Sequence, residues 1–174
     1  ALTERFTRQE EEITRQVAEI LADVKSGGDR SLREITRRVE GRDPGTFEVP
    51  ADVRAEAAAL IPAALKEALA TAKTNIETFH RAQLAPEVDT ETMPGIRCVQ
   101  RAVPIRRVGL YIPGGKAPLF STVLMLAVPA RVAGCGEVIL CTPVRPDGTI
   151  APEILYAADL CGVDRIFSLG GAQA

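Results

Sequence analysis

The stretch VGLYIPGGKAPLFSTVLMLAVPARVAGC, Val108–Cys135, decides the fold class together with EVILCTP at Glu137–Pro143. Its pattern predicts a short apolar strand over Val108–Ile112, a glycine-rich turn, and a helix over Ser121–Val132. A second apolar strand follows at Glu137–Cys141. Strands this apolar are buried on both faces, and helices of this length between them make right-handed crossovers. The stretch therefore predicts a parallel sheet.

The same alternation continues toward the C-terminus. A second helix is predicted over Ala151–Leu160 and a third strand over Arg165–Leu169, followed by Gly170-Gly171. These elements make an incomplete, Rossmann-like parallel βαβαβ sheet of the α/β class. A third strand that feeds a glycine pair normally leads into another helix. We therefore expect an unpaired sheet edge and a chain that is a piece of something longer.

The residues before the sheet predict helices. An amphipathic helix is stopped by Gly27 and Gly28, and a second helix follows it to Val39. Pro50 introduces another helix, which is interrupted near Pro62 and followed by a long one. The apolar stripe of the first helix comprises Ile13, Val17, Ile20, Leu21 and Val24, and that of the long helix comprises Leu65, Leu69, Ala72, Ile76 and Phe79.

A β-hairpin is predicted between the helices and the sheet. Residues Val88–Ile105 alternate apolar and polar side chains, and Pro94-Gly95 lies between two such runs. The fold class is thus α/β, with N-terminal helices and a β-hairpin followed by the parallel sheet.

Composition excludes several classes of partner. The 174 residues are 46% hydrophobic and 25% charged, which is typical of a globular chain. A net charge of −2 gives no reason to expect nucleic acid or an anionic membrane surface as partner. The most apolar run, Ala117–Val132, is short for a membrane span and contains Pro118, Pro129 and Arg131, so we interpret it as a core helix.

Cysteine usage indicates a reducing compartment. The four cysteines form no CxxC pair, and His80 is the single histidine, so this chain offers no zinc site of the usual spacing. The charged N-terminus lacks the apolar segment of a signal peptide. We expect a cytoplasmic protein with mostly buried, reduced thiols at Cys98, Cys135, Cys141 and Cys161.

Two glycine-rich turns are candidate ligand-binding sites. Ligands of open parallel sheets bind outside the carboxyl ends of the strands, where Pro113-Gly114-Gly115 and Gly170-Gly171 are expected. Glycine allows close approach of a ligand, and a following helix N-terminus offers N–H groups to phosphate. Neither the Walker A pattern nor GxGxxG is present. These residues alone leave open whether the turns bind a nucleotide or only shape the chain.

Longer stretches resemble one family in the same order along the chain. VGLYIPGGKAPLFSTVLMLAVPARVAGC, EVILCTP, EILYAADLCGV and SLGGAQA resemble the histidinol dehydrogenase family. EEITRQVAEILADVKSGGDRSLRE, NIETFHRAQ and PGIRCVQRAVPIRRVGLYIPGG are similar to its N-terminal portion. The resemblance covers nearly the whole chain.

The resemblance implies a concrete activity. Members of the family oxidise L-histidinol to L-histidine through the aldehyde, using two NAD molecules, in the last steps of histidine biosynthesis. They are zinc-dependent homodimers with paired, incomplete Rossmann-like domains. Tyr111 and Gln173 match residues that contact NAD, and Pro113, Gly114 and Gly115 match the loop beside the cofactor.

The resemblance also implies a domain division. Residues 1–106 would be the helical and hairpin part of a discontinuous domain, and residues 107–174 the first part of the NAD-side domain. Family members are well over twice as long as this chain, and the further part holds the zinc ligands and the acid–base Glu and His. We therefore expect no catalytic or metal-binding residue here and no activity of the chain alone.

Other interpretations stay open. The chain could be a stand-alone, non-catalytic α/β module that binds a nucleotide or protein, or an assembly fragment whose helical stripes pair with another chain. Tyr111 could be a core aromatic at a strand end, and the role of Gln173 depends wholly on the resemblance. His80 is better interpreted as a surface or helix-end residue than as a ligand, because it lacks metal partners.

Overall fold

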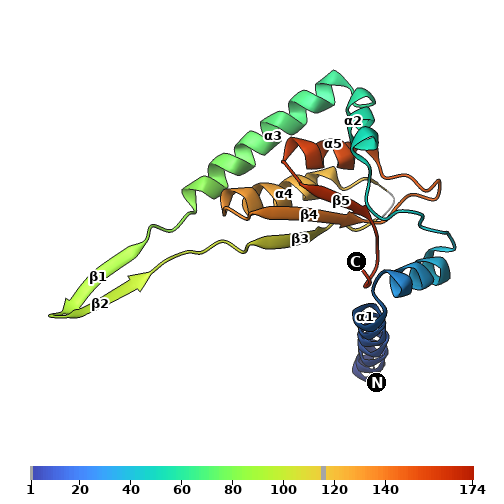
Figure 1. Ribbon diagram of the computed structural model, residues 1–174, viewed down its shortest axis with the longest axis horizontal. Helices are drawn as coiled ribbons and strands as arrows, with labels where there is room; N and C mark the ends of the chain where they lie inside the picture. The colour runs from blue at the N-terminus through green and yellow to red at the C-terminus, as the bar shows by residue number, and fades with distance from the viewer. Residues whose placement is uncertain (1, 115–116) are drawn as a thin grey trace.

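The chain folds into helices, a hairpin and a parallel sheet, as Figure 1 shows. The computed structural model describes residues 2–114 and 117–174, with side chains from residue 10 onward. The helices are α1 (Leu2–Glu40), α2 (Ala51–Ala59), α3 (Ala63–Ala82), α4 (Phe120–Val132) and α5 (Pro152–Leu160). The strands are β1 (Val88–Met93), β2 (Ile96–Gln100), β3 (Arg107–Tyr111), β4 (Glu137–Thr142) and β5 (Arg165–Ser168).

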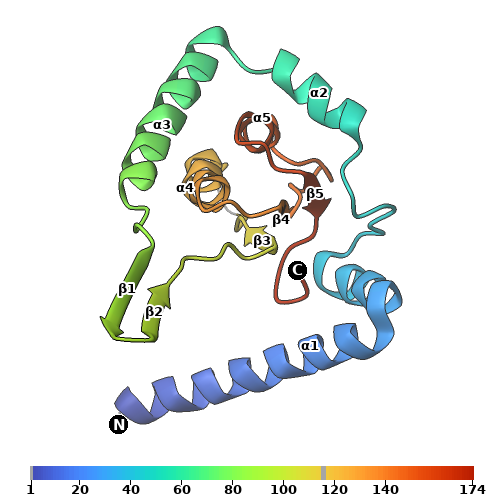
Figure 2. The same cartoon turned by 60° about the vertical axis from the view of Figure 1, so that its left-hand side comes forward.

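The three later strands form the predicted parallel sheet in the order β3-β4-β5. Val108 is paired with Val138, and Leu140 with Ile166. Helices α4 and α5 cover one face of the sheet, and α3 and α2 pack on their outer sides (Figure 2). The predicted α/β fold class is confirmed, with a second helical layer contributed by the N-terminal part of the chain.

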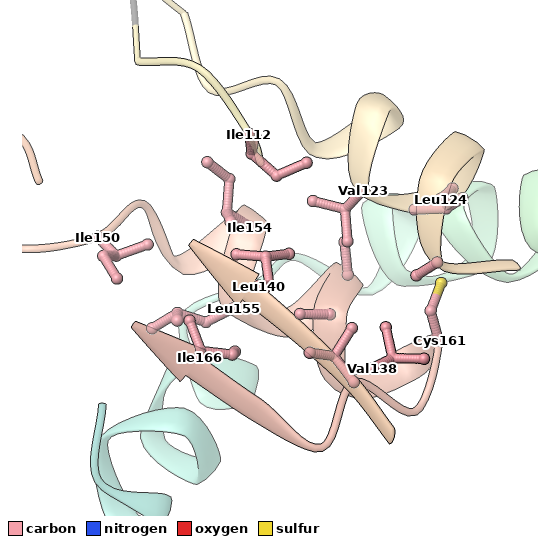
Figure 3. Packing of buried hydrophobic residues seen from close by; sticks show 14 of the residues in the cluster. Ile112, Val123, Leu124, Val138, Leu140, Ile150, Ile154, Leu155, Cys161 and Ile166 are labelled. Carbon is pink, nitrogen blue, oxygen red and sulfur yellow. The ribbon is translucent and has the colours of Figure 1, made fainter. Parts of the chain in front are cut away.

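The hydrophobic core lies between the sheet and its two helices. Side chains alternate across a strand, so Val138 and Leu140 of β4 point to the same face, where they are fully buried. Ile166 of β5 and Leu124 of α4 complete this layer (Figure 3). The opposite face of β3 carries the exposed Tyr111, so the two faces of the sheet differ in their surroundings.

The outer edge of β5 is not free. Glu48 forms a bridge with Phe167, the Val49 N–H donates to the Ile166 carbonyl at 2.8 Å, and the Ser168 N–H donates to the Phe47 carbonyl at 2.7 Å. An ion pair between Arg165 and Glu48, 2.7 Å, adds to this contact. The expectation of an unpaired edge is wrong for β5, because a segment about 120 residues earlier in the chain supplies the missing hydrogen bonds.

Helix α1 is divided at the predicted glycines. Gly28 has φ 55° and ψ −139°, outside the helical region, so two helices meet there at a kink. The first of them extends away from the sheet (Figure 2). Two residues of its apolar stripe, Ile13 and Leu21, are each 52% exposed, whereas Val17, Ile20 and Val24 are half-buried.

The long predicted helix is α3, and it packs as its stripe indicates. Leu69 is buried, and Leu65, Ala72 and Ile76 pack against the core. Phe79, by contrast, is 64% exposed, so the last turn of the helix does not bury its part of the stripe. The apolar stripe therefore predicts the packing face for most of the helix but not for its last turn.

The hairpin projects from the body of the protein (Figure 1). Its turn contains Gly95, φ 85°, and every residue of both strands is exposed. The second strand ends at Gln100 rather than near Ile105, because Gln100 is already paired with Val88, the first residue of the other strand. Beyond this pair the strand pairing stops, and an ion pair between Arg101 and Glu87, 3.0 Å, still joins the two segments.

The amino end of the sheet is held by a charged cluster. The Asp164 carboxylate accepts hydrogen bonds from the Val138 N–H, 2.7 Å, and from Arg131, 2.6 Å. Arg54 of α2 forms an ion pair with Asp159 and donates to the carbonyls of Val163 and Asp164. This cluster joins α2, α4 and α5 at the end of the sheet opposite to the glycine turns.

Candidate functional site

Tyr111 ends β3 at the carboxyl edge of the sheet. Its side chain is 42% exposed, so the aromatic ring is accessible, and it is not the core aromatic of the alternative interpretation. Its hydroxyl oxygen accepts a hydrogen bond from the Gly171 N–H at 3.1 Å. The structure thus brings together the residues after the first and third parallel strands, which are 60 positions apart in sequence.

Gln173 lies in the same turn and is 5% exposed. Its amide nitrogen Nε2 is buried and has no hydrogen-bond partner within the described part of the chain. A buried donor without an acceptor costs roughly 1–3 kcal/mol, so such groups usually have a function or a missing partner. Gly171 makes the arrangement possible, because a Cβ there would lie 2.5 Å from Gln173 Oε1.

The two glycine turns also have a packing role. Pro143, the first residue after β4, lies between them. A Cβ on Gly114 would lie 2.6 Å from Pro143 Cγ, and one on Gly170 would lie 2.6 Å from Pro143 Cβ and 3.2 Å from its Cα. The three strand-end turns are therefore in direct contact. A side chain at either position would force a shift at Pro143, whether or not a ligand binds.

Two cavities open at this end of the sheet. Cavity A, about 540 Å³, lies between the β3 turn and the connection from β4 to α5, and Pro113 and Gly114 line it. Cavity B, about 850 Å³, lies between that connection, the end of α1 and the last turn, which contributes Gln173. Gly115, the remaining predicted loop residue, lies outside the described residues. These volumes are in the range of small-molecule and cofactor sites.

The connection from β4 to α5 is a part of the site that sequence reasoning missed. Residues Pro143–Asp147 line both cavities. The pKa of Asp147 is lowered, chiefly because the Thr149 hydroxyl donates to its carboxylate and also because the Thr149 N–H does. The sequence Pro146-Asp147-Gly148 at the end of a strand signals only a turn, so it did not stand out as part of a site.

The described residues contain no group that fits a metal ion. No three of their His, Cys, Asp and Glu side chains come together as a ligand set. His80 lies in the last turn of α3 with its ring against that of Phe79. Burial raises the pKa of Cys141 and brings that of Cys161 to about 11, so these thiols are poor nucleophiles. Cys98 is exposed, unlike the buried Cys135.

No helix in the described ranges combines the length and the apolar character that a membrane crossing needs. The fold and the site together define a class. This is an α/β chain with a parallel sheet whose strand-end turns surround cavities of cofactor size, as in nucleotide-binding sheets.

The chain belongs to the histidinol dehydrogenase family, whose family model matches residues 3–174. It is 55% identical over 164 residues to the histidinol dehydrogenase of Escherichia coli O6:H1, covering 94% of this chain and 37% of that protein. It is 55% identical over 162 residues to that of Salmonella typhi, covering 93% and 36%. The chain thus spans a little over a third of the length of these relatives.

A solved structure gives the same result. The crystal structure of histidinol dehydrogenase from Elizabethkingia anophelis matches with a TM-score of 0.87 at 40% identity, covering 92% of this chain and 37% of that one. Together with the family match, this confirms the predicted family resemblance and the mixed fold of helices, hairpin and parallel sheet.

Proposed function

We propose that this chain forms part of the NAD-side wall of a histidinol dehydrogenase, which oxidises L-histidinol to L-histidine through the aldehyde. The observation that carries the proposal is the buried, unpartnered Nε2 of Gln173, next to the Tyr111–Gly171 contact. The family membership of the chain supports the substrate and the biosynthetic role.

The residues at the carboxyl end of the sheet fit a dinucleotide. The exposed ring of Tyr111 offers an apolar face, and the turn that holds Gln173 lines cavity B. Pro113 and Gly114 let the cofactor approach the backbone at cavity A, and by the family pattern Gly115 does the same. When bound, NAD supplies the hydride acceptor. The residues described here bind and orient it.

Zinc does not fit the described residues, because they contain no ligand set. By the family pattern, the zinc ligands and the acid–base residues of the proposed enzyme belong to a further part of a family-length protein, and we derive no step through the metal. The homodimer and the cytoplasmic location stay predictions from the family resemblance. So does the domain boundary near residue 106, although α2 and α3 pack directly against α5 and α4.

The test is NADH formation, followed by absorbance, with L-histidinol, NAD and zinc. We expect no turnover from residues 1–174 alone and turnover from the family-length enzyme. We also expect calorimetry to show weak or no NAD binding by the isolated chain, because part of the cofactor's surroundings lies outside it. Turnover by the isolated chain would contradict the proposal and would make His80 the first residue to substitute.

A further inference from the structure

The connection from β4 to α5 separates the two cavities. Its residues Pro143–Asp147 contact cavity A on one side and cavity B on the other. Among the described residues that line cavity A, the charged side chains are those of Arg145 and Asp147. Among the described residues, a ligand in this cavity therefore meets one cation and one anion, both on the same connection.

We propose that Asp147 binds the ribose hydroxyls of the adenosine half of the cofactor and so selects NAD over its 2′-phosphorylated form. This inference rests on the proposed NAD function, and it assigns a specificity-determining residue to that site.

The position of Asp147 in the sheet supports this role. In open dinucleotide-binding sheets the turn after the first strand takes the pyrophosphate, and an acidic residue after the neighbouring second strand accepts the ribose 2′-hydroxyl. Here β3 is the first parallel strand and β4 is its hydrogen-bonded neighbour. Gly114 follows β3, Asp147 follows β4, and both line cavity A.

The Asp147 side chain is held as an oriented acceptor. Its Oδ1 accepts hydrogen bonds from the Thr149 N–H at 2.9 Å and from the Thr149 hydroxyl at 2.7 Å. No hydrogen bond to its Oδ2 is found in the described part of the chain, which leaves that oxygen for a ligand hydroxyl. The backbone is also fixed, because the Arg145 N–H donates to the Thr149 carbonyl and the Gly148 N–H donates to the Arg145 carbonyl.

Arg145 is the competing candidate, since a guanidinium could bind a 2′-phosphate. Its charge is shared with Glu153, whose carboxylate lies 3.5 Å away. A 2′-phosphate near Arg145 would also approach the ionised Asp147 on the same turn and be repelled by it. These charges favour the unphosphorylated ribose, and binding of the phosphorylated form becomes an outcome of the test.

Calorimetry on the family-length enzyme that contains this chain tests the assignment, with ADP-ribose and 2′-phospho-ADP-ribose as ligands. We expect the wild type to prefer ADP-ribose. Asp147→Asn should weaken ADP-ribose about tenfold or more and reduce the preference, because a hydrogen bond to a charged acceptor is lost. Thr149→Val should have a smaller effect in the same direction, since it removes one of the two bonds that orient Asp147.

Asp52→Asn, an identical change in the exposed first turn of α2, is the matched control and should leave the preference unchanged. Three results would overturn the inference: no binding of either ligand, a wild-type preference for the phosphorylated ligand, or the same preference in Asp147→Asn as in the wild type. Turnover of histidinol with NAD tests the proposed function separately. If the enzyme turns over histidinol but its ligand preference does not depend on Asp147, the proposed function stands and the role of Asp147 is wrong. If the ligand preference depends on Asp147 but there is no turnover, the role of Asp147 stands and the proposed function is wrong.

Discussion

The Tyr111 hydroxyl and the Gly171 N–H are joined by a hydrogen bond of 3.1 Å, across the ends of β3 and β5. The strand between them, β4, ends in Pro143, which contacts the glycine turns on both sides. The ends of all three parallel strands are therefore connected by short-range contacts.

Tyr111→Phe should destabilise the chain by about 0.5–1 kcal/mol, because it removes one partly exposed hydrogen bond and leaves the ring in place. Urea unfolding followed by circular dichroism measures the difference. Tyr156→Phe is the control, since no hydrogen bond of the Tyr156 hydroxyl is found among the described residues. Equal effects of the two substitutions would show that the Gly171 contact adds no stability.

Tyr111→Ala in the family-length enzyme should raise the apparent Kd for NAD more than that for histidinol. The substitution removes the exposed ring, which we propose faces the cofactor, and leaves the strand intact. We expect a loss of about 1–3 kcal/mol in NAD binding, the range for a buried aromatic contact. Calorimetry with each ligand measures it, and an unchanged NAD affinity would remove Tyr111 from the proposed site.

Gly170→Ala should destabilise the fold by about 1–3 kcal/mol through overpacking, because the new Cβ would lie 3.2 Å from the Pro143 Cα, a backbone atom. Gly109→Ala in β3 is the matched control. Its Cβ would meet Ile139 at an ordinary 3.9 Å, so we expect no loss or a small gain. Thermal unfolding of both variants gives the comparison, and similar midpoints would contradict the tight contact at Pro143.

Asp164 should make stability depend on pH in the acid range. The Val138 N–H, and secondarily Arg131, hold the pKa of this carboxyl below its ordinary value. The ionised group therefore stabilises the fold above about pH 4, the pKa of an unfolded Asp, and this contribution is lost as pH falls through the folded-state pKa.

Asp164→Asn should lower the free energy of unfolding by about 1 kcal/mol at pH 7, a value reduced for solvent screening. Between pH 5 and pH 3, the free energy of unfolding should fall less in this variant than in the wild type. Urea titrations at a series of pH values measure the difference. Glu56→Gln, an exposed charge on α2, is the control. If the free energy of unfolding changes with pH in the same way in the wild type and in Asp164→Asn, the Asp164 carboxylate is not a source of the pH dependence.

Local signals in the sequence predict most of the elements. The apolar runs around Leu110, Leu140 and Ile166 locate the strands within one or two residues, since such runs have few alternatives to a buried strand. Gly28 locates the kink in α1, because a positive φ favours glycine. The hairpin follows from Pro94-Gly95 between alternating runs.

The long-range contacts are the part that local patterns do not reveal. Nothing around Phe47 predicts that its carbonyl pairs with β5, because an isolated bridge has neither the length nor the alternation of a strand. Gln173 has no intrinsic signal either, and only the structure reveals that it is buried with an amide nitrogen that lacks a partner among the described residues. Asp147 becomes a candidate site residue only when the structure shows that the connection from β4 to α5 lines both cavities.

The bridge from Glu48 to Phe167 makes the two edges of the sheet different. The earlier segment occupies the β5 side, whereas β3 pairs only with β4 in the described part of the chain. A strand edge without a partner can pair with another molecule, so we expect self-association of the purified chain to increase with its concentration.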